Sequence, residues 1–135
     1  MSKLLERLRD PARSGVYRAR VRNDIEEATR ASRLDVVAID AAADVFAGMA
    51  AALNFPPWFG ANWDALEDCL SDLSWRERDG YVLVLASYPG EDVLGVLIDV
   101  LRSVAEYWAS RGKPFFAVFL DPEKKLALPD LYREA

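Results

Sequence analysis

Three short apolar segments of strand length, separated by segments of helical character, constrain the fold of this chain more than any other feature. They comprise residues 34–41, 81–87 and 115–120. Continuous apolar runs of this length are typical of strands that are buried on both faces of a sheet. Strands that alternate with helices favour a parallel sheet with right-handed crossovers. The sequence therefore predicts an α/β fold built on a small parallel sheet of three strands with packed helices.

A capping residue and a pair of prolines mark the helix after the first strand. Asp44 is a suitable N-cap for the alanine-rich run 45–53, because its carboxylate can accept hydrogen bonds from free backbone N–H groups. Residues 54–57, Asn-Phe-Pro-Pro, end this helix, since proline lacks an N–H donor and restricts the residue before it. In the loop that follows, we expect Gly60 to supply any positive φ that is needed.

The next helix is predicted to begin after Asn62, a second favourable N-cap, with Asp64 in its first turn, where the helix dipole favours negative charge. Apolar residues at i, i+3, i+4 and i+7 define its buried face: Leu66, Cys69, Leu70 and Leu73. At about 100° per residue, Asp64 and Asp68 fall almost opposite this face and one turn apart. Both carboxylates are therefore expected to point into solvent together.

A longer amphipathic helix is predicted over residues 93–109, and Gly112 stands where a glycine commonly terminates a helix. The side chains expected to face the core from this helix are Leu94, Leu97, Ile98, Leu101, Val104 and Ala105.

Residues 1–33 are the least regular part of the sequence. Weak alternation over residues 16–21 leaves open a fourth strand at one edge of the sheet, and residues 25–32 are compatible with a helix. A basic, partly mobile arm is an equally open alternative, because arginines are frequent in this segment. We therefore divide the chain into a basic N-terminal extension, residues 1–33, and a domain of residues 34–135.

Charge is distributed unevenly along the chain. Residues 1–33 contain nine Lys or Arg and five Asp or Glu, whereas residues 34–75 contain seven acids and no base. An acidic stretch of this length repels nucleic acid and attracts basic partners. The alternative interpretation is an acidic surface that only keeps the protein in solution.

The composition excludes several chemistries. The chain has no histidine, which excludes Ser-His and Cys-His nucleophiles and zinc sites that need imidazole. Cys69 lies on the core face of its helix, so we expect a buried hydrophobic residue and not a reactive thiolate. Asp64 and Asp68 on a convex helix lack the burial that a glycosidase acid requires, and they offer too few oxygen ligands for magnesium. We expect no enzymatic activity, no cofactor and no metal.

The sequence also indicates a location. Residues 1–15 lack the apolar core of a signal peptide, and no segment approaches the ~20 apolar residues that span a bilayer. A single cysteine excludes a disulfide within the chain, which fits a reducing compartment. We expect a cytoplasmic protein with no membrane partner.

Three aromatic residues, Trp58, Phe59 and Trp63, lie close in sequence to the two outward aspartates. One interpretation is that all three pack into the core. However, Trp58 belongs to a loop between Pro57 and Gly60, so we expect it to be exposed. Aromatic residues flanked by carboxylates are typical of a protein-binding surface for a basic target.

The run from Phe55 to Leu70, FPPWFGANWDALEDCL, resembles the signature of the barstar family. In that family a proline, an aromatic pair, Gly, Asn, Asp-Ala-Leu and Asp-Cys-Leu occur at this spacing. Nine residues match the pattern as they stand: Pro56, Gly60, Asn62, Asp64, Ala65, Leu66, Asp68, Cys69 and Leu70. A weaker resemblance follows the order of strands and helices from about residue 34 to residue 120.

The resemblance implies one-to-one inhibition, inside the producing cell, of a basic extracellular bacterial ribonuclease. It implies that Asp68 enters the phosphate-binding pocket of the enzyme among arginines and that Asp64 approaches a second basic group. Trp58 would take the place of an aromatic residue that stacks near a catalytic histidine of the enzyme. The implied partner-binding set is Trp58, Phe59, Gly60, Asn62, Trp63, Asp64 and Asp68, with Glu106 on the last long helix as a looser match.

Four positions depart from the family pattern. Trp63 replaces a leucine, Glu67 a tryptophan, Ala61 a glutamate and Trp58 a tyrosine. These changes keep the carboxylates but leave the identity of the partner open. The alternative function is that of an immunity protein, or antitoxin, with the same fold against another toxin such as a deoxyribonuclease.

Overall fold

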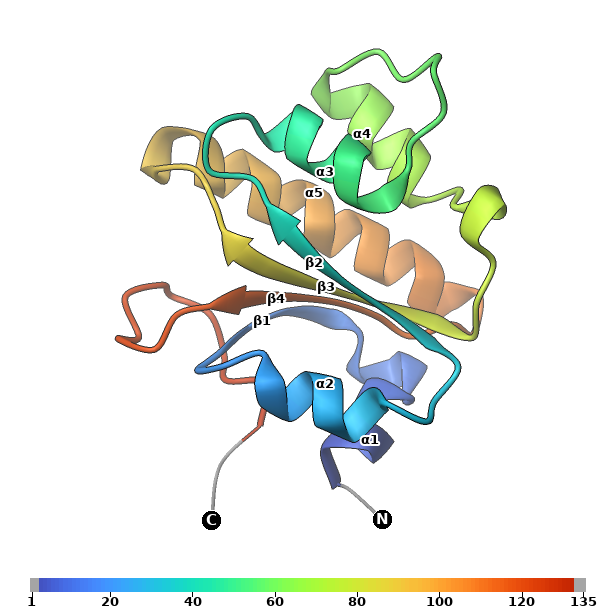
Figure 1. Cartoon of the computed structure of the whole chain (residues 1–135), viewed down its shortest axis with the longest axis vertical. Coiled ribbons are helices and arrows are strands. Elements are labelled where there is room, and N and C mark those ends of the chain that lie inside the picture. The colour runs from blue at the N-terminus through green and yellow to red at the C-terminus, as the bar shows by residue number, and fades with distance from the viewer. Residues whose placement is uncertain (1–2, 133–135) are drawn as a thin grey trace.

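The computed structural model describes residues 3–132, and a parallel sheet lies at its centre (Figure 1). The strands are β1 (Gly15–Ala19), β2 (Leu34–Asp40), β3 (Gly80–Ser87) and β4 (Phe115–Leu120), and they pair in the order β1-β4-β3-β2. The helices are α1 (Lys3–Leu8), α2 (Asn23–Thr29), α3 (Val45–Leu53), α4 (Trp63–Leu70) and α5 (Glu91–Ser110), with short 3₁₀ helices η1 (Pro11–Arg13) and η2 (Ser74–Arg76). The predicted α/β class is confirmed.

Helices cover both faces of the sheet, with α3, α4 and α5 on one side and α1 and α2 on the other (Figure 1). Leu83 and Leu85 of β3 pack in the core under α3, α4 and α5, whereas Val82 and Val84 pack in the core under α1 and α2. Side chains on both faces of a central strand are therefore buried. For this reason the central strands are apolar at successive positions and show no alternation of apolar and polar residues.

The fourth strand left open by the sequence is present. β1 pairs with β4 along its whole length, and α2 follows it. Arg18 does not prevent this pairing, because its Nε lies 2.8 Å from Oδ1 of Asp130 near the C-terminal end of the chain. Residues 15–19 are thus a strand of the sheet and not an arm. The division of the chain at residue 33 stays a prediction.

The predicted boundaries of α3 and α5 agree with the structure to within two residues, whereas α2 ends at Thr29, three residues before its predicted end. Asp44 caps α3, and its Oδ1 accepts hydrogen bonds from the backbone N–H groups of Phe46 (3.0 Å) and Ala47 (3.2 Å). Gly112 follows α5 with a φ of 77°, in the left-handed region that glycine adopts without steric cost. Of the core positions predicted on α5, Ile98 is only half-buried and the others are buried.

A buried ion pair connects η2 to the edge of the sheet. The Asp35 carboxylate of β2 accepts hydrogen bonds from Nε (2.8 Å) and Nη2 (3.1 Å) of Arg76. The third guanidinium nitrogen donates to Oδ1 of Asn54 at the end of α3 (2.7 Å). These contacts raise the pKa of Arg76, chiefly through the hydrogen bonds to Asp35. One acid of the stretch 34–75 is therefore neutralised inside the fold and does not belong to the acidic surface.

We predict that Arg76→Ala lowers the free energy of unfolding by about 3 kcal/mol, because it leaves the Asp35 carboxylate buried without its counter-ion. Arg102→Ala is the matched control, since Arg102 is exposed and 3.9 Å from its nearest carboxylate oxygen; its effect should stay below about 0.5 kcal/mol. Urea unfolding of the two variants measures both values. Equal losses would contradict the role given to the Asp35–Arg76 pair.

Candidate functional site

The loop that carries the family-like motif is fixed to the start of α4 by Asn62. Its Oδ1 accepts a hydrogen bond from the backbone N–H of Ala65 (2.8 Å), and its Nδ2 donates to the carbonyl oxygen of Gly60 (3.3 Å). The side chain thus caps the helix and holds the preceding turn with the same amide group. Asn62 is the predicted N-cap, and this prediction is confirmed.

The prediction for Gly60 is wrong. The left-handed residue of this loop is Ala61, with a φ of 50°, whereas Gly60 does not adopt a positive φ. The presence of glycine at position 60 has a different physical explanation. A Cβ atom at this position would lie 3.2 Å from Nδ2 of Asn62, which is a tight contact. Glycine at position 60 therefore gives the capping side chain room for its close approach, and the loop accepts strain at Ala61.

The inward face of α4 fixes how the helix is rotated. Leu66, Cys69 and Leu70 are fully buried, and Nε1 of Trp108 on α5 donates to the carbonyl oxygen of Leu70 (2.8 Å). Burial raises the pKa of the Cys69 thiol, with Asp72 and Asp68 contributing in the same direction. The thiol is therefore less ionised than a free cysteine, which agrees with the expectation of a packing role.

The outward face of α4 and the residues just after it carry four exposed acids: Asp64, Glu67, Asp68 and Asp72. Within residues 3–132, no Lys or Arg nitrogen lies within 4.0 Å of any of these four carboxylates. A rise of about 1.5 Å per residue separates Asp64 from Asp68 by about 6 Å along the helix axis. The helix therefore presents a row of negative charges that form no ion pair with any cation of residues 3–132.

Two of these acids extend the set predicted from the sequence. Glu67 and Asp72 were not assigned to the site, although both lie on the solvent side of α4 or immediately beyond it. At about 100° per residue, Glu67 lies about 60° from Asp64, and Asp72 lies about 40° beyond Asp68. The same helical geometry that selected Asp64 and Asp68 would have found them.

The three motif aromatics divide between solvent and core. Trp58 is 66% exposed. Phe59 and Trp63 are half-buried; Phe59 packs edge-on against Phe55 (ring centroids 4.8 Å apart) and Trp63 against Phe46 (4.9 Å). The exposure expected for Trp58 is confirmed, and the interpretation that all three are core residues is wrong.

A cluster of aromatic rings beneath the loop supports Trp58. Phe55, which packs on Phe59, also meets the ring of Trp75 at 6.0 Å, and Nε1 of Trp75 donates to the carbonyl oxygen of Leu53 (2.9 Å). These contacts tie the loop to the end of α3 and to η2. The backbone that carries Trp58 is therefore held in place, which lowers the entropy that the loop would lose on binding.

Glu106 lies apart from the other candidate residues. On α5 it lines a cavity with Gly15 and Val16 of β1 and with Pro129, whereas Trp108 on the same helix faces α4. The two positions differ by about 200° around the helix. Glu106 is exposed, and its role in binding stays a prediction.

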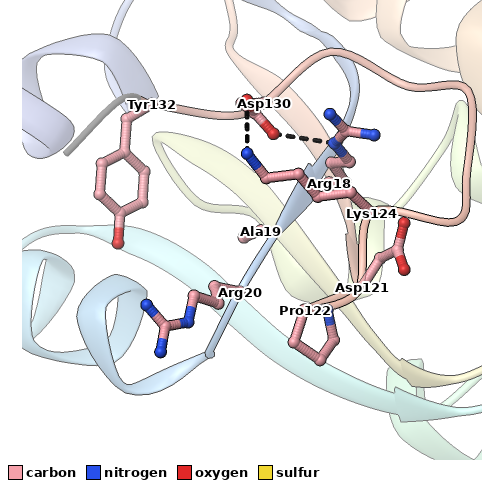
Figure 2. Close-up of a pocket in the computed structure, with 8 residues that line it drawn as sticks. All are labelled: Arg18, Ala19, Arg20, Asp121, Pro122, Lys124, Asp130 and Tyr132. Carbon is pink, nitrogen blue, oxygen red and sulfur yellow. Dashed lines mark hydrogen bonds and ion pairs between the residues drawn. The ribbon is translucent and has the colours of Figure 1, made fainter.

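A cavity of about 850 Å³ lies at the carboxyl ends of β1 and β4, and several of its polar groups are engaged by the chain itself (Figure 2). Figure 2 shows Arg18 and Lys124 directed toward Asp130, at 2.8 and 3.9 Å. The oxygens of Asp121 accept from the backbone N–H groups of residues 125 and 126 (3.0 and 2.7 Å). These groups order the C-terminal segment and give no arrangement of nucleophile, base and oxyanion donor.

Two features are absent from residues 3–132. In that range, no group of three or more His, Cys, Asp or Glu side chains is placed to hold a metal ion. No helix in the same range is long and apolar enough to cross a membrane.

Comparison with protein families gives one match. The model of the family described as Barstar (barnase inhibitor) matches residues 29–120. The match contains β2, β3, β4, the motif loop and all of α4. Searches of curated proteins and of solved structures gave no match.

We predict that Ala61→Gly stabilises the fold by about 0.5–1 kcal/mol, because it removes the cost of a left-handed residue that has a Cβ atom. Ala51→Gly, at an exposed position within α3, is the matched control and should destabilise by about 0.5–1 kcal/mol. Thermal or urea unfolding gives the sign of each change. Destabilisation by both substitutions would show that Ala61 is not strained.

Proposed function

The chain belongs to the barstar family of barnase inhibitors, and from this we propose that it inhibits a basic secreted ribonuclease by filling the RNA-binding cleft of the enzyme with α4 and Trp58. The complex is one-to-one and forms inside the producing cell. The observation that carries the proposal is the pair Asp64 and Asp68, exposed on one side of α4 with no cation from residues 3–132 within 4.0 Å.

The chemistry of the target explains why carboxylates suit this task. A ribonuclease binds the phosphates of RNA through Arg and Lys side chains and backbone N–H groups. A carboxylate presents two oxygens to a guanidinium, in the planar geometry that a phosphate also offers. Asp68, near the middle of the exposed row, is suited to the phosphate pocket, and Asp64, one turn earlier, to a second basic group. Glu67 and Asp72 lie beside them.

Trp58 supplies the apolar part of the contact. Exposed aromatic side chains that become fully buried in a complex are frequent among residues that dominate binding energy. Trp58 is 66% exposed, so a large part of its ring is available to a partner. The ring can stack on an aromatic or imidazole side chain at the edge of the enzyme's cleft. The Asn62 cap and the aromatic cluster hold the loop so that Trp58 and the acids of α4 are presented together.

The wider charge distribution favours rapid encounter. With Asp35 neutralised by Arg76, six acids of the stretch 34–75 remain exposed: Asp40, Asp44, Asp64, Glu67, Asp68 and Asp72. A field of this sign raises the association rate with a basic protein, and salt screens it. It also repels RNA, so the inhibitor has little tendency to bind the substrate of the enzyme.

We predict that Asp68→Ala weakens binding to a barnase-type ribonuclease by about 2–5 kcal/mol, or roughly 30- to 4000-fold in Kd. This is the general cost of truncating one partner of a desolvated charge pair; charge pairs of the barnase–barstar complex, the worked example for this family, reach higher values. Asp99→Ala on α5 is the matched control, because Asp99 is an exposed helical aspartate outside the motif. Its Kd should change by less than about threefold.

Isothermal titration and inhibition of RNA cleavage measure these effects at low and high salt. Binding of the Asp68→Ala variant as tight as that of the unmodified chain would contradict the mechanism. If the unmodified chain leaves ribonucleases active but blocks a toxin of another class, such as a deoxyribonuclease, the immunity function is supported and the ribonuclease proposal fails.

For Trp58, we predict that Trp58→Ala weakens binding by at least about 2 kcal/mol, or roughly 30-fold in Kd, chiefly through faster dissociation, whereas Trp58→Phe keeps most of the affinity. Both variants should unfold at nearly the same temperature as the unmodified chain, because the side chain is mostly in solvent. Surface plasmon resonance separates the two rate constants. Unchanged dissociation of the alanine variant would exclude Trp58 from the contact.

A further inference from the structure

The segments before α2 and after β4 have no part in the proposed inhibitory surface, yet together they build the cavity of about 850 Å³ at the carboxyl ends of β1 and β4. Residues 18–20 line it from β1 and the turn that follows, and residues between 121 and 132 line it from the C-terminal segment. All of these positions lie outside residues 29–120, which match the family model. The cavity therefore belongs to parts of this chain that the family match does not include.

The position of the cavity is one at which parallel sheets commonly bind ligands. The chain leaves β1 toward α2 on one face of the sheet and leaves β3 toward α5 on the other face (Figure 1). β4 lies between these two strands. In open parallel sheets, ligands bind outside the carboxyl ends of the strands, at the place where the connections change face. The volume of the cavity is within the range that holds a small organic molecule.

More cationic than anionic side chains line the cavity. The cations are Arg18, Arg20 and Lys124, and the carboxylates are those of Asp121 and Asp130. The Asp121 oxygens accept hydrogen bonds from two backbone N–H groups of the C-terminal segment. The Asp130 oxygens lie 2.8 Å from Nε of Arg18 and 3.9 Å from Nζ of Lys124. Each carboxylate that lines the cavity thus has its partner in the chain.

Arg20 is the cation of the cavity that has no counter-ion. Its side chain is exposed, and among residues 3–132 no carboxylate oxygen lies within 4.0 Å of its guanidinium nitrogens. A guanidinium offers five N–H donors in a planar arrangement that matches the oxygens of a phosphate. Arg18 and Lys124 add positive charge, although Asp130 offsets part of it. These groups favour an anionic ligand.

An aromatic ring lines the same cavity. Figure 2 shows the Arg20 side chain extending toward the side on which Tyr132 lies. The hydroxyl group of Tyr132 donates a hydrogen bond to the Asp24 carboxylate, which orients the ring at the wall of the cavity. An aromatic ring near a guanidinium suits a ligand that combines a planar organic part with a phosphate group, because the ring stacks on the first and the guanidinium binds the second.

We propose that this cavity binds a small phosphorylated molecule. Arg20 binds the phosphate group, in the positive field of Arg18 and Lys124, and the ring of Tyr132 contacts the organic part of the ligand. Because the cavity is formed by residues 18–20 and the C-terminal segment together, a ligand in it connects the two segments and stabilises the folded chain.

This site goes beyond the proposed function and is separate from the inhibitory surface. α4 packs on α5 and lies with α3 on the face of the sheet opposite α1 and α2 (Figure 1). Neither Trp58 nor any acid of α4 lines the cavity. The chain can therefore bind a phosphorylated molecule and an enzyme at the same time, and the two activities can be tested independently.

Thermal unfolding with added AMP, sodium phosphate or sodium chloride at equal ionic strength tests the proposal. AMP carries both a phosphate group and a planar base, so we expect it to raise the unfolding temperature in a saturable manner and more than inorganic phosphate does. Sodium chloride only screens charge and should have no saturable effect. Equal shifts with all three salts, or no shift with AMP, would overturn the proposal. Equal affinity for AMP and inorganic phosphate would overturn the contact assigned to Tyr132.

Substitution of Arg20 tests the contact with the phosphate group. Arg20→Gln removes the charge at an exposed position, and we expect it to weaken AMP binding by roughly 10- to 100-fold in Kd, measured by isothermal titration. Arg9→Gln is the matched control. Arg9 is exposed, has no carboxylate oxygen within 4.0 Å in the described part of the chain, and lines a different cavity at the amino ends of the strands. Equal weakening by both substitutions would show a response to net charge alone and would overturn the site.

NMR titration of the ¹⁵N-labelled chain with AMP locates the ligand. We expect saturable shifts on backbone amides of residues 18–20 and 121–132, and shifts confined to other residues would overturn the proposal. Two variants separate this site from the inhibitory function. Arg20→Gln should bind a barnase-type ribonuclease like the unmodified chain, and Asp68→Ala should bind AMP like the unmodified chain. Loss of AMP binding by the Asp68→Ala variant would place the ligand on the inhibitory surface and would overturn the separate site.

Discussion

The site depends on one constraint, the burial of the inward face of α4. Its side chains are Leu66, Cys69 and Leu70. These side chains set the rotation of the helix, and the rotation places the acids of α4 in solvent. The cost of exposing adjacent like charges on one helix is modest, because water and salt screen them. A partner that supplies cations to this face gains interactions that the free protein does not satisfy. The same core that stabilises the fold thus determines what the surface can bind.

Local signals in the sequence predicted a large part of the structure. The apolar segments gave three strands, and Asp44 and Asn62 gave the starts of α3 and α4, because capping acts over two or three residues. β1 remained undecided, since Arg18 within it is compensated by Asp130, which lies far along the chain. The Asp35–Arg76 pair is hidden for the same reason: it forms only when η2 packs beside β2.

The site was predictable where helical periodicity applies and unpredictable where loop geometry decides. The outward direction of Asp64 and Asp68 follows from residue spacing alone. The left-handed conformation falls on Ala61 and not on Gly60, where the missing Cβ instead leaves room for the Asn62 side chain. The half-burial of Phe59 and Trp63 depends on Phe46 and Phe55, whose positions are set by α3 and its end. The contacts of Phe46 with Phe59 and Trp63 join residues far apart in the sequence and have no local signature.

The most direct measurement is NMR titration of the ¹⁵N-labelled chain with a barnase-type ribonuclease. Occupation of the enzyme's cleft by α4 predicts that the largest shifts fall on the Trp58 indole N–H and on backbone amides of residues 58–72, with α1 and α2 on the other face of the sheet unaffected. Shifts concentrated on α1, α2 or the basic N-terminal segment, with Trp58 and α4 unchanged, would contradict an inhibitory surface built on the acidic helix.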